Sequence, residues 1–263
     1  QHFLIMPPVC LTLLSLQNQS PADQSSLSFD QLNFVLYPLP IISPPSTSCI
    51  KQLTASTIRF ILSKLTLSTF IPQGGFIMAT IVITGGHGGI GYECSKTLGK
   101  EYRMNLVLVG RSRERMERVA QELREKYAVR VTVVCMDTSS LESVRSGTAE
   151  IERRIDRKEI DPLQGISCDA GVRLSGPLAY SVDGYELTFA TNYLGHFLFV
   201  EGLKHDVTPN GRIVFTSSGT HDPDTTDGKM MGIAADYDAF ALANAGKNNV
   251  KPNSKGKSYT TSK

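Results

Sequence analysis

The chain has 263 residues, a formal net charge of +2, 41% hydrophobic residues and no Trp. These values suit one ordinary globular domain, or one domain with an appendage. They exclude a collagen-like chain, a long coiled coil and a disulfide-rich scaffold. Charge is unevenly distributed along the sequence, however, so the two parts of the chain have to be considered separately.

Residues 1–77 are poor in charge and rich in Ser, Thr, Leu, Ile and Pro. The charged side chains of this stretch are Asp23, Asp30, Lys51, Arg59 and Lys64. Prolines interrupt the helical patterns, and the apolar runs are too short or too polar to span a bilayer. We therefore expect a non-domain, largely unstructured extension, either translated upstream sequence or an organelle-targeting segment. Met78 stands directly before an apolar strand and is expected to open the folded part.

From Met78 onwards, short apolar runs alternate with longer amphipathic segments. Strands are expected at 81–83, 106–109, 129–135, 165–168 and 212–216, and helices at 89–102, 113–127, 140–155 and 183–203. This alternation indicates βαβ units and a parallel sheet covered by helices on both faces. The predicted fold class for residues 78–263 is α/β, a doubly wound parallel sheet of the Rossmann type.

A glycine-rich loop joins the first of these strands to the first helix. It reads Thr84-Gly85-Gly86-His87-Gly88-Gly89-Ile90-Gly91. Gly85 would permit the tight turn, Gly89 would let the backbone approach a pyrophosphate, and Gly91 would let the helix pack on the strand. The free N–H groups of the helix N-terminus would face the phosphates. We therefore predict a dinucleotide site at Thr84, Gly85, His87, Gly89, Ile90 and Gly91.

The end of the second strand bears on the choice of dinucleotide. An NAD enzyme usually has an acidic residue there for the ribose 2′-hydroxyl, and this chain has Gly110. Arg111 follows and could pair with a 2′-phosphate, although it could also be a solvated loop charge. The pattern favours NADP(H) over NAD(H).

A second motif, Tyr259-Thr260-Thr261-Ser262-Lys263, places Tyr259 and Lys263 on one face of a helix. Together with the spacing of the glycine loop, it resembles the classical short-chain dehydrogenase/reductase family. The amino-acid sequence of residues 184–199 is similar to that of the retinol dehydrogenase and protochlorophyllide reductase branch of this family. Further matching positions, in family order, are Asp137, Cys168-Asp169-Ala170-Gly171, Asn192 and Ser218.

The resemblance implies a catalytic set made of Asn192, Ser218, Tyr259 and Lys263. Tyr259 would give a proton to a carbonyl oxygen while the carbon receives hydride, because a nearby ammonium favours the phenolate form. Ser218 would hydrogen-bond that oxygen, Lys263 would also hold the nicotinamide ribose, and Asn192 would anchor a water of the proton relay. The resemblance also implies cofactor contacts at Asp137, Ala170 and Gly171.

Three departures from the family pattern stand out. Asp169 replaces the usual Asn, and a buried carboxylate there would lose the donors of an amide. Residues 222–257 are polar and Gly-rich, and we expect an insertion that is ordered only in part. The sequence also stops at Lys263, where the catalytic helix would scarcely have begun, so we expect a C-terminally truncated fragment with little or no turnover.

Other candidate sites are weaker. The five cysteines contain no CxxC pair, and no residue pattern predicts a metal. His196 is expected to be a packing residue, and the basic run at 247–257 does not indicate nucleic-acid binding.

The function favoured by the sequence is NADP(H)-dependent interconversion of a small-molecule carbonyl and alcohol. The alternatives are a non-catalytic dinucleotide-binding sensor and a non-functional truncated gene product. We expect a cytoplasmic protein without a membrane-spanning segment, or an organellar one if residues 1–77 are a targeting segment. The full-length parent could form homo-oligomers.

Overall fold

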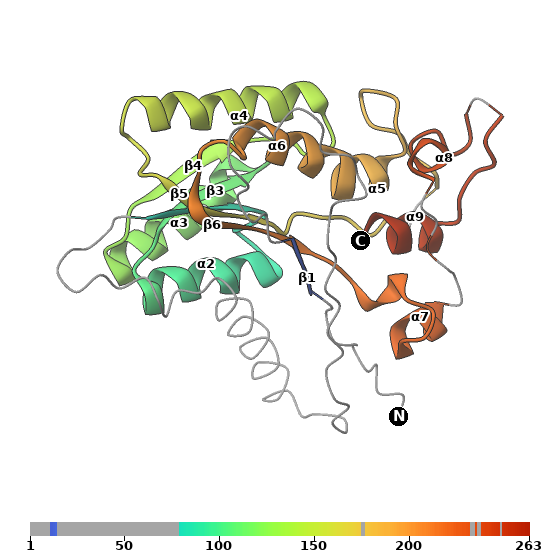
Figure 1. Cartoon of the computed structure of the whole chain (residues 1–263), viewed down its shortest axis with the longest axis horizontal. Helices are drawn as coiled ribbons and strands as arrows, with labels where there is room; N and C mark the ends of the chain where they lie inside the picture. The colour runs from blue at the N-terminus through green and yellow to red at the C-terminus, as the bar shows by residue number, and fades with distance from the viewer. Residues whose placement is uncertain (1–10, 15–78, 175–176, 232–234, 236–237, 248) are drawn as a thin grey trace.

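The computed structural model describes residues 11–14, 79–174, 177–231, 235, 238–247 and 249–263 (Figure 1). The extension predicted at 1–77 lies outside the described residues, except for the strand β1, Leu11–Leu14. This strand pairs antiparallel with the last strand of the sheet, from Leu11 opposite Thr216 to Leu14 opposite Ile213.

The other strands form the parallel sheet that the sequence predicts. They are β2 (Thr80–Thr84), β3 (Asn105–Gly110), β4 (Val131–Cys135), β5 (Leu163–Cys168) and β6 (Val207–Thr216). The order across the sheet is β1-β6-β5-β2-β3-β4. Because the chain moves outwards from β2 in one direction and then returns to continue in the other, the sheet is doubly wound.

Helices cover both faces of this sheet (Figure 1). The main ones are α2 (Gly89–Tyr102), α3 (Arg113–Tyr127), α4 (Leu141–Asp156) and α6 (Gly195–Leu203). Buried side chains of α2 and α3 pack on one face, and those of α4 and α6 pack on the other. The predicted α/β class and its Rossmann-type arrangement are confirmed. In the part of the chain that the structure describes, no helix combines the length and apolar character needed to cross a membrane.

Local chemistry explains where these helices begin. Ser112 and Ser140 stand before α3 and α4, and the side chain of each accepts a hydrogen bond from a backbone N–H of the first turn. Arg103 and Ala128, in the left-handed region at φ 56° and 52°, end α2 and α3.

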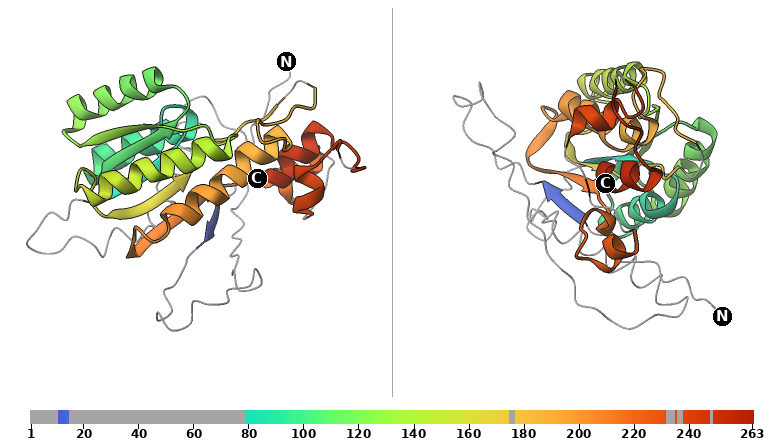
Figure 2. Two further views of the ribbon diagram at one scale, coloured as in Figure 1. Left: turned by 90° about the horizontal axis from the view of Figure 1, so that it is seen from above. Right: turned by 90° about the vertical axis from the view of Figure 1, so that its right-hand side faces the viewer.

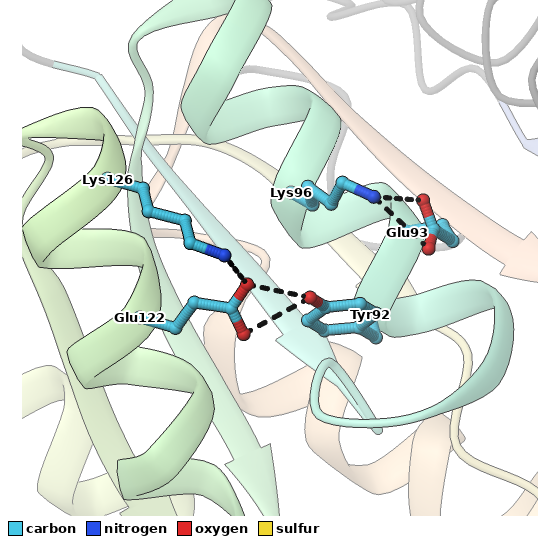
Figure 3. Close-up of polar contacts among 5 residues, drawn as sticks. All are labelled: Tyr92, Glu93, Lys96, Glu122 and Lys126. Carbon is cyan, nitrogen blue, oxygen red and sulfur yellow. Dashed lines mark hydrogen bonds and ion pairs between the residues drawn. The ribbon is translucent and has the colours of Figure 1, made fainter.

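The two helices on one face are also joined by a polar contact (Figure 3). The Tyr92 hydroxyl of α2 donates to both carboxylate oxygens of Glu122 in α3, at 3.0 and 3.2 Å. Lys126 donates to the same carboxylate at 2.8 Å. These hydrogen bonds, that of Lys126 first, lower the pKa of Glu122, so the carboxylate stays ionised as an acceptor.

The helix predicted at 183–203 is wrong at its start, and five of its residues form a π-helix. Gly184 has φ 84° and forms a turn, so the helical segment begins only at α5 (Leu187–Phe189). The π-helix η4 (Ala190–Leu194) follows, in which Gly195 N–H bonds to the Ala190 carbonyl five residues back. Such π-turns are frequent at functional sites, and this one contains Asn192.

Helices form in part of the segment at 222–257. It contains α7 (Thr226–Met231), α8 (Ala239–Ala243) and the start of α9 (Lys255–Ser262). Glu186 N–H donates to the Ala243 carbonyl at 2.9 Å, and the Tyr180 hydroxyl donates to the Ala245 carbonyl at 3.0 Å. Leu242 is buried, so polar and apolar contacts together hold α8 on the chain around residue 186. All three helices lie beyond one end of the sheet (Figure 2).

Candidate active site

The candidate site lies at the carboxyl edge of the parallel strands. β2 stands between β5 and β3, where the winding of the sheet changes direction. In open α/β sheets, ligands bind in the crevice at this switch point. The glycine loop leaves β2 there, the segment from Asp169 leaves β5, and Ser218 follows β6.

The glycine loop forms an open cradle. Gly85 and Gly89 have φ 71° and 52°, conformations that favour glycine. A Cβ on Gly91 would lie 2.5 Å from the Gly85 carbonyl oxygen, whereas a Cβ on Gly88 or Gly89 would meet nothing within 4 Å. The N-cap of α2, Gly88, has no side-chain hydrogen bond to the first turn, and that turn contains no acidic residue. Ile90 lies in this turn, half-buried. Open space in front of such a helix N-terminus fits a pyrophosphate group.

A cationic corner adjoins the cradle at the end of β3. His87 packs so close to Gly110 that a Cβ there would lie 2.9 Å from the imidazole Cε1. Burial lowers the pKa of His87, and the charges of Arg115 and Arg111 lower it further. Arg111 itself is exposed. The predicted residues His87 and Arg111 therefore share one corner with Arg115, a residue in the first turn of α3 that sequence reasoning missed.

Thr84 serves the segment after β5. Its side chain is fully buried, and its hydroxyl oxygen accepts the backbone N–H groups of Asp169 and Ala170 at 3.0 and 3.1 Å. Ala170 in turn packs against Gly85, where a Cβ would lie 3.0 Å from its Cα. Thr84 thus fixes the position of Ala170 beside the glycine loop. Asp137, at the end of β4, accepts the N–H and hydroxyl of Ser139 at 2.9 and 2.7 Å.

Asn192 ties the same segment to the helix that carries the Tyr-Lys motif. Its side-chain oxygen accepts Val172 N–H at 2.7 Å, and its amide donates to the Val172 carbonyl at 3.0 Å. The amide also donates to Ser262 Oγ of α9 at 3.0 Å. A Cβ on Gly171 would lie 3.2 Å from Asn192 Oδ1 and 3.0 Å from Lys263 Nζ, so these three residues share one corner.

Lys263 and Asp169 are both half-buried and lie close to each other. Lys263 Nζ donates to the Thr216 carbonyl at 3.1 Å, and the Thr216 hydroxyl donates to the Asp169 carboxylate at 2.8 Å. Burial lowers the pKa of Lys263, and the charge of Asp169 opposes this. Burial raises the pKa of Asp169, and the Thr216 hydroxyl, the Lys263 charge and the Gly91 N–H oppose this.

The replacement of the family Asn by Asp169 therefore leaves the local order intact. An ionised carboxylate only accepts hydrogen bonds, and this one accepts them from the Gly91 N–H at the start of α2 and from the Thr216 hydroxyl at the end of β6. The carboxylate thus lies between the glycine loop and the candidate catalytic lysine. Sequence reasoning did not foresee this position.

Ser218 and Tyr259 complete the predicted set. Ser218 Oγ accepts the Thr220 hydroxyl at 3.0 Å, which leaves its own proton to donate. Tyr259 lies half-buried on α9, with the Arg173 guanidinium carbon 5.6 Å from its ring centroid. Helix α9 packs against α5 and against the short helix η5 (Gly219–His221) that follows Ser218. The Tyr259 and Ser218 hydroxyls and the half-buried Lys263 ammonium therefore lie at the same edge of the sheet.

His196 is the functional candidate that the sequence did not reveal. It is buried, as expected of a packing residue, but both ring nitrogens are hydrogen-bonded. Nε2 lies 2.9 Å from Thr84 Oγ1, and Nδ1 lies 3.0 Å from the Asn192 carbonyl oxygen. Only the fold brings Thr84 beside it, so no sequence pattern could have found the contact.

Known proteins resemble this chain over the same region. Oxidoreductase calI of Penicillium decumbens is 35% identical over 157 residues, which is 55% of this chain and 44% of that protein. A chloroplastic protochlorophyllide reductase of Daucus carota is 32% identical over 175 residues, which is 62% of this chain and 41% of the relative. The chain thus spans less than half the length of these relatives.

Among solved structures, a putative uncharacterized protein from Mycobacterium Paratuberculosis matches with a TM-score of 0.53 and 25% identity, over 72% of this chain and 58% of that one. The family model described as short chain dehydrogenase matches residues 79–225, more than half of the sequence. With the fold and these matches in agreement, the chain belongs to the short-chain dehydrogenase family.

Proposed function

We propose that the protein is an NADP(H)-dependent oxidoreductase that interconverts a carbonyl and an alcohol. The observation that carries the proposal is the proximity of two parts at one sheet edge: the open glycine cradle and the set formed by Asn192, Ser218, Tyr259 and Lys263. The names of the relatives, an oxidoreductase and a reductase, support the same reaction class.

The residues of the set would divide the chemistry as follows. The cofactor, when bound, supplies or removes the hydride at the substrate carbon. The Tyr259 hydroxyl gives its proton to the carbonyl oxygen in reduction and takes it back in oxidation. The Ser218 hydroxyl donates a hydrogen bond to that oxygen and orients it. Lys263, a half-buried ammonium four residues from Tyr259, favours the phenolate that remains after the transfer.

The cationic corner supports NADP(H) over NAD(H). Arg111 is exposed beside the cradle, with His87 and Arg115 next to it. A guanidinium offers a 2′-phosphate paired N–H donors and charge, whereas no acidic residue stands at Gly110 for a ribose hydroxyl.

Substitution of Tyr259 by Phe tests the proposal. With NADPH and a panel of small aldehydes and ketones, we expect the Tyr259→Phe variant to lose about 100-fold or more in kcat. Tyr102→Phe, a tyrosine at the far end of α2, is the matched control and should keep its rate. Equal rates for all three proteins would refute the role of Tyr259.

Binding of NADPH separates the alternatives. The sequence predicts little turnover for this length of chain, so NADPH titration is also needed, since it requires no chemistry. If the protein binds NADPH but reduces no carbonyl, the dinucleotide-binding sensor is favoured. If it does not bind NADPH at all, the non-functional product is favoured.

The compartment in which the protein acts is also a proposal that rests on the sequence pattern. We propose a cytoplasmic protein acting on a small molecule, with an organelle as the alternative. The word "chloroplastic" in the name of the Daucus carota relative supports that alternative. Fractionation of cells that express the tagged protein would decide between the two.

A further inference from the structure

His196 connects the glycine loop to Asn192 through two hydrogen bonds. The imidazole is 2% exposed and lies in the first turn of α6. Its Nδ1 faces the Asn192 carbonyl oxygen at 3.0 Å, and its Nε2 faces the Thr84 hydroxyl at 2.9 Å. Thr84 and Asn192 each fix the segment after β5, at Asp169–Ala170 and at Val172 respectively.

The contacts define where the protons lie. A carbonyl oxygen can only accept, so Nδ1 must carry the proton that faces Asn192. Nε2 of the neutral ring is then an acceptor, and the Thr84 hydroxyl donates to it. The alternative acceptor for that hydroxyl, the Ser167 carbonyl, is 3.5 Å away, which is long for a hydroxyl bond. The two lone pairs of Thr84 Oγ1 accept the N–H groups of Asp169 and Ala170.

We propose that His196 is a positioning residue: a neutral imidazole, protonated on Nδ1, that sets the segment after β5 through Thr84 and the candidate catalytic edge through Asn192. This inference rests on the proposed function for its catalytic consequence, but not for the state of the ring.

The surroundings disfavour a second proton. A proton on Nε2 would point at Thr84 Oγ1, whose lone pairs are already used, so the network would have to break. Burial is the dominant cause that holds the pKa of His196 at about 4; the hydrogen bond with the Asn192 carbonyl opposes it, and the Lys263 ammonium adds to it. The other charged group at this corner is Asp169, whose carboxylate is turned towards Thr216 and the N–H of Gly91.

Two substitutions separate the two contacts. In His196→Asn the amide nitrogen can replace Nδ1 and still donate to Asn192, but the side chain is too short to reach Thr84. In His196→Gln the amide oxygen can replace Nε2 and still accept from Thr84, but the contact with Asn192 is lost. The exposed His205, beyond the end of α6, provides the matched controls His205→Asn and His205→Gln.

The two His196 substitutions should affect different quantities, one the affinity for NADPH and the other kcat. We expect His196→Asn to weaken NADPH binding about tenfold, and His196→Gln to keep that affinity and lower kcat about tenfold, because small displacements at a site have such effects. The His205 controls should change neither quantity. Equal losses of stability with unchanged NADPH affinity and kcat would mean a purely structural role and would overturn the inference.

Nitrogen NMR of the unmodified protein tests the ring state without any turnover. Two-bond proton–nitrogen correlations should show a protonated Nδ1 and a bare Nε2 for His196 from about pH 8 down to about pH 5.5. A ring protonated on Nε2, or one that titrates in this range, would overturn the inference even if the enzyme reduces carbonyls. If the ring is as expected and no carbonyl is reduced, the proposed function fails instead.

Discussion

Asn192 and Ser262 are joined by a hydrogen bond of 3.0 Å, although they are 70 residues apart in the sequence. The bond connects the π-turn of η4 to α9, the helix that carries Tyr259 and Lys263. Helix α9 has eight residues and would be marginal in isolation. Its place at the site therefore depends on contacts of this kind.

Removal of the Asn192 amide should cost more than removal of the Ser262 hydroxyl. Asn192→Leu would remove three hydrogen bonds, two of them to the half-buried N–H and carbonyl of Val172, and we expect a loss of about 2–3 kcal/mol. Ser262→Ala removes only one of the contacts and should cost about 1 kcal/mol. Urea unfolding measures both, and a Ser262→Ala variant less stable than Asn192→Leu would contradict the assigned contacts.

Substitution by Ala should destabilise the protein at one glycine of the cradle and have little effect at another. A Cβ on Gly91 would lie 2.5 Å from a backbone oxygen and 2.8 Å from Asp169, whereas one on Gly88 would enter open space. Gly91→Ala should lower the free energy of unfolding by about 1–3 kcal/mol, and Gly88→Ala should leave it nearly unchanged. Thermal unfolding without cofactor compares the two, and equal effects would show that the close approach at Gly91 is wrong.

Arg111 should determine the preference between NADPH and NADH. We expect Arg111→Gln to weaken NADPH binding about 10–100-fold, since a charge-assisted bidentate contact is lost, while NADH binding changes little. Arg118→Gln is the control, because Arg118 is an exposed residue of α3 that pairs with Glu114 at 3.8 Å. Fluorescence titration measures the affinities. A parallel loss for both cofactors would mean that Arg111 does not contact the 2′-phosphate.

The free energy of unfolding should fall in mild acid because of His196. Burial lowers the folded-state pKa of this ring to about 4, from the ordinary value of 6.5. Between these values the unfolded chain binds the extra proton, so stability is constant above about pH 6.5 and decreases as the pH is lowered through this window, by about 3 kcal/mol. Urea unfolding over a pH series should show a shallower slope for His196→Gln than for the unmodified protein. Identical slopes would exclude His196 as the cause.

Asp169 should influence the alkaline side of the pH–rate profile. Its charge opposes the lowering of the Lys263 pKa by burial. In Asp169→Asn that opposition is lost, so Lys263 should give up its proton at lower pH, and the decline of kcat at high pH should move to lower pH. Asp156→Asn, at the exposed end of α4, serves as the control. A profile unchanged by Asp169→Asn would mean that Lys263 does not govern that limb.

The sequence predicted the sheet and the cradle well because the responsible signals are local. β2 and β3 are apolar runs bounded by turn residues, and the glycines at 85 and 89 adopt the positive φ values that such a loop requires. The start of β6 was missed because Pro209 and Gly211 resemble a turn, yet the strand continues through them.

What the sequence could not predict depends on partners distant in the chain. The role of His196 requires Thr84, 112 positions earlier, and the satisfied carboxylate of Asp169 requires Thr216, 47 positions later. The helix α8 within the segment at 222–257 is another such feature, because it is held by backbone groups of Glu186 and Ala243 that carry no sequence signal.

Transfer of deuterium from NADPH labelled at the nicotinamide C4 tests the central claim most directly. The product alcohol formed from an aldehyde or ketone should carry the label at the former carbonyl carbon, as detected by mass spectrometry, and the Tyr259→Phe variant should yield almost none. Unlabelled alcohol, or equal labelling by the unmodified protein and Tyr259→Phe, would contradict hydride transfer assisted by this tyrosine.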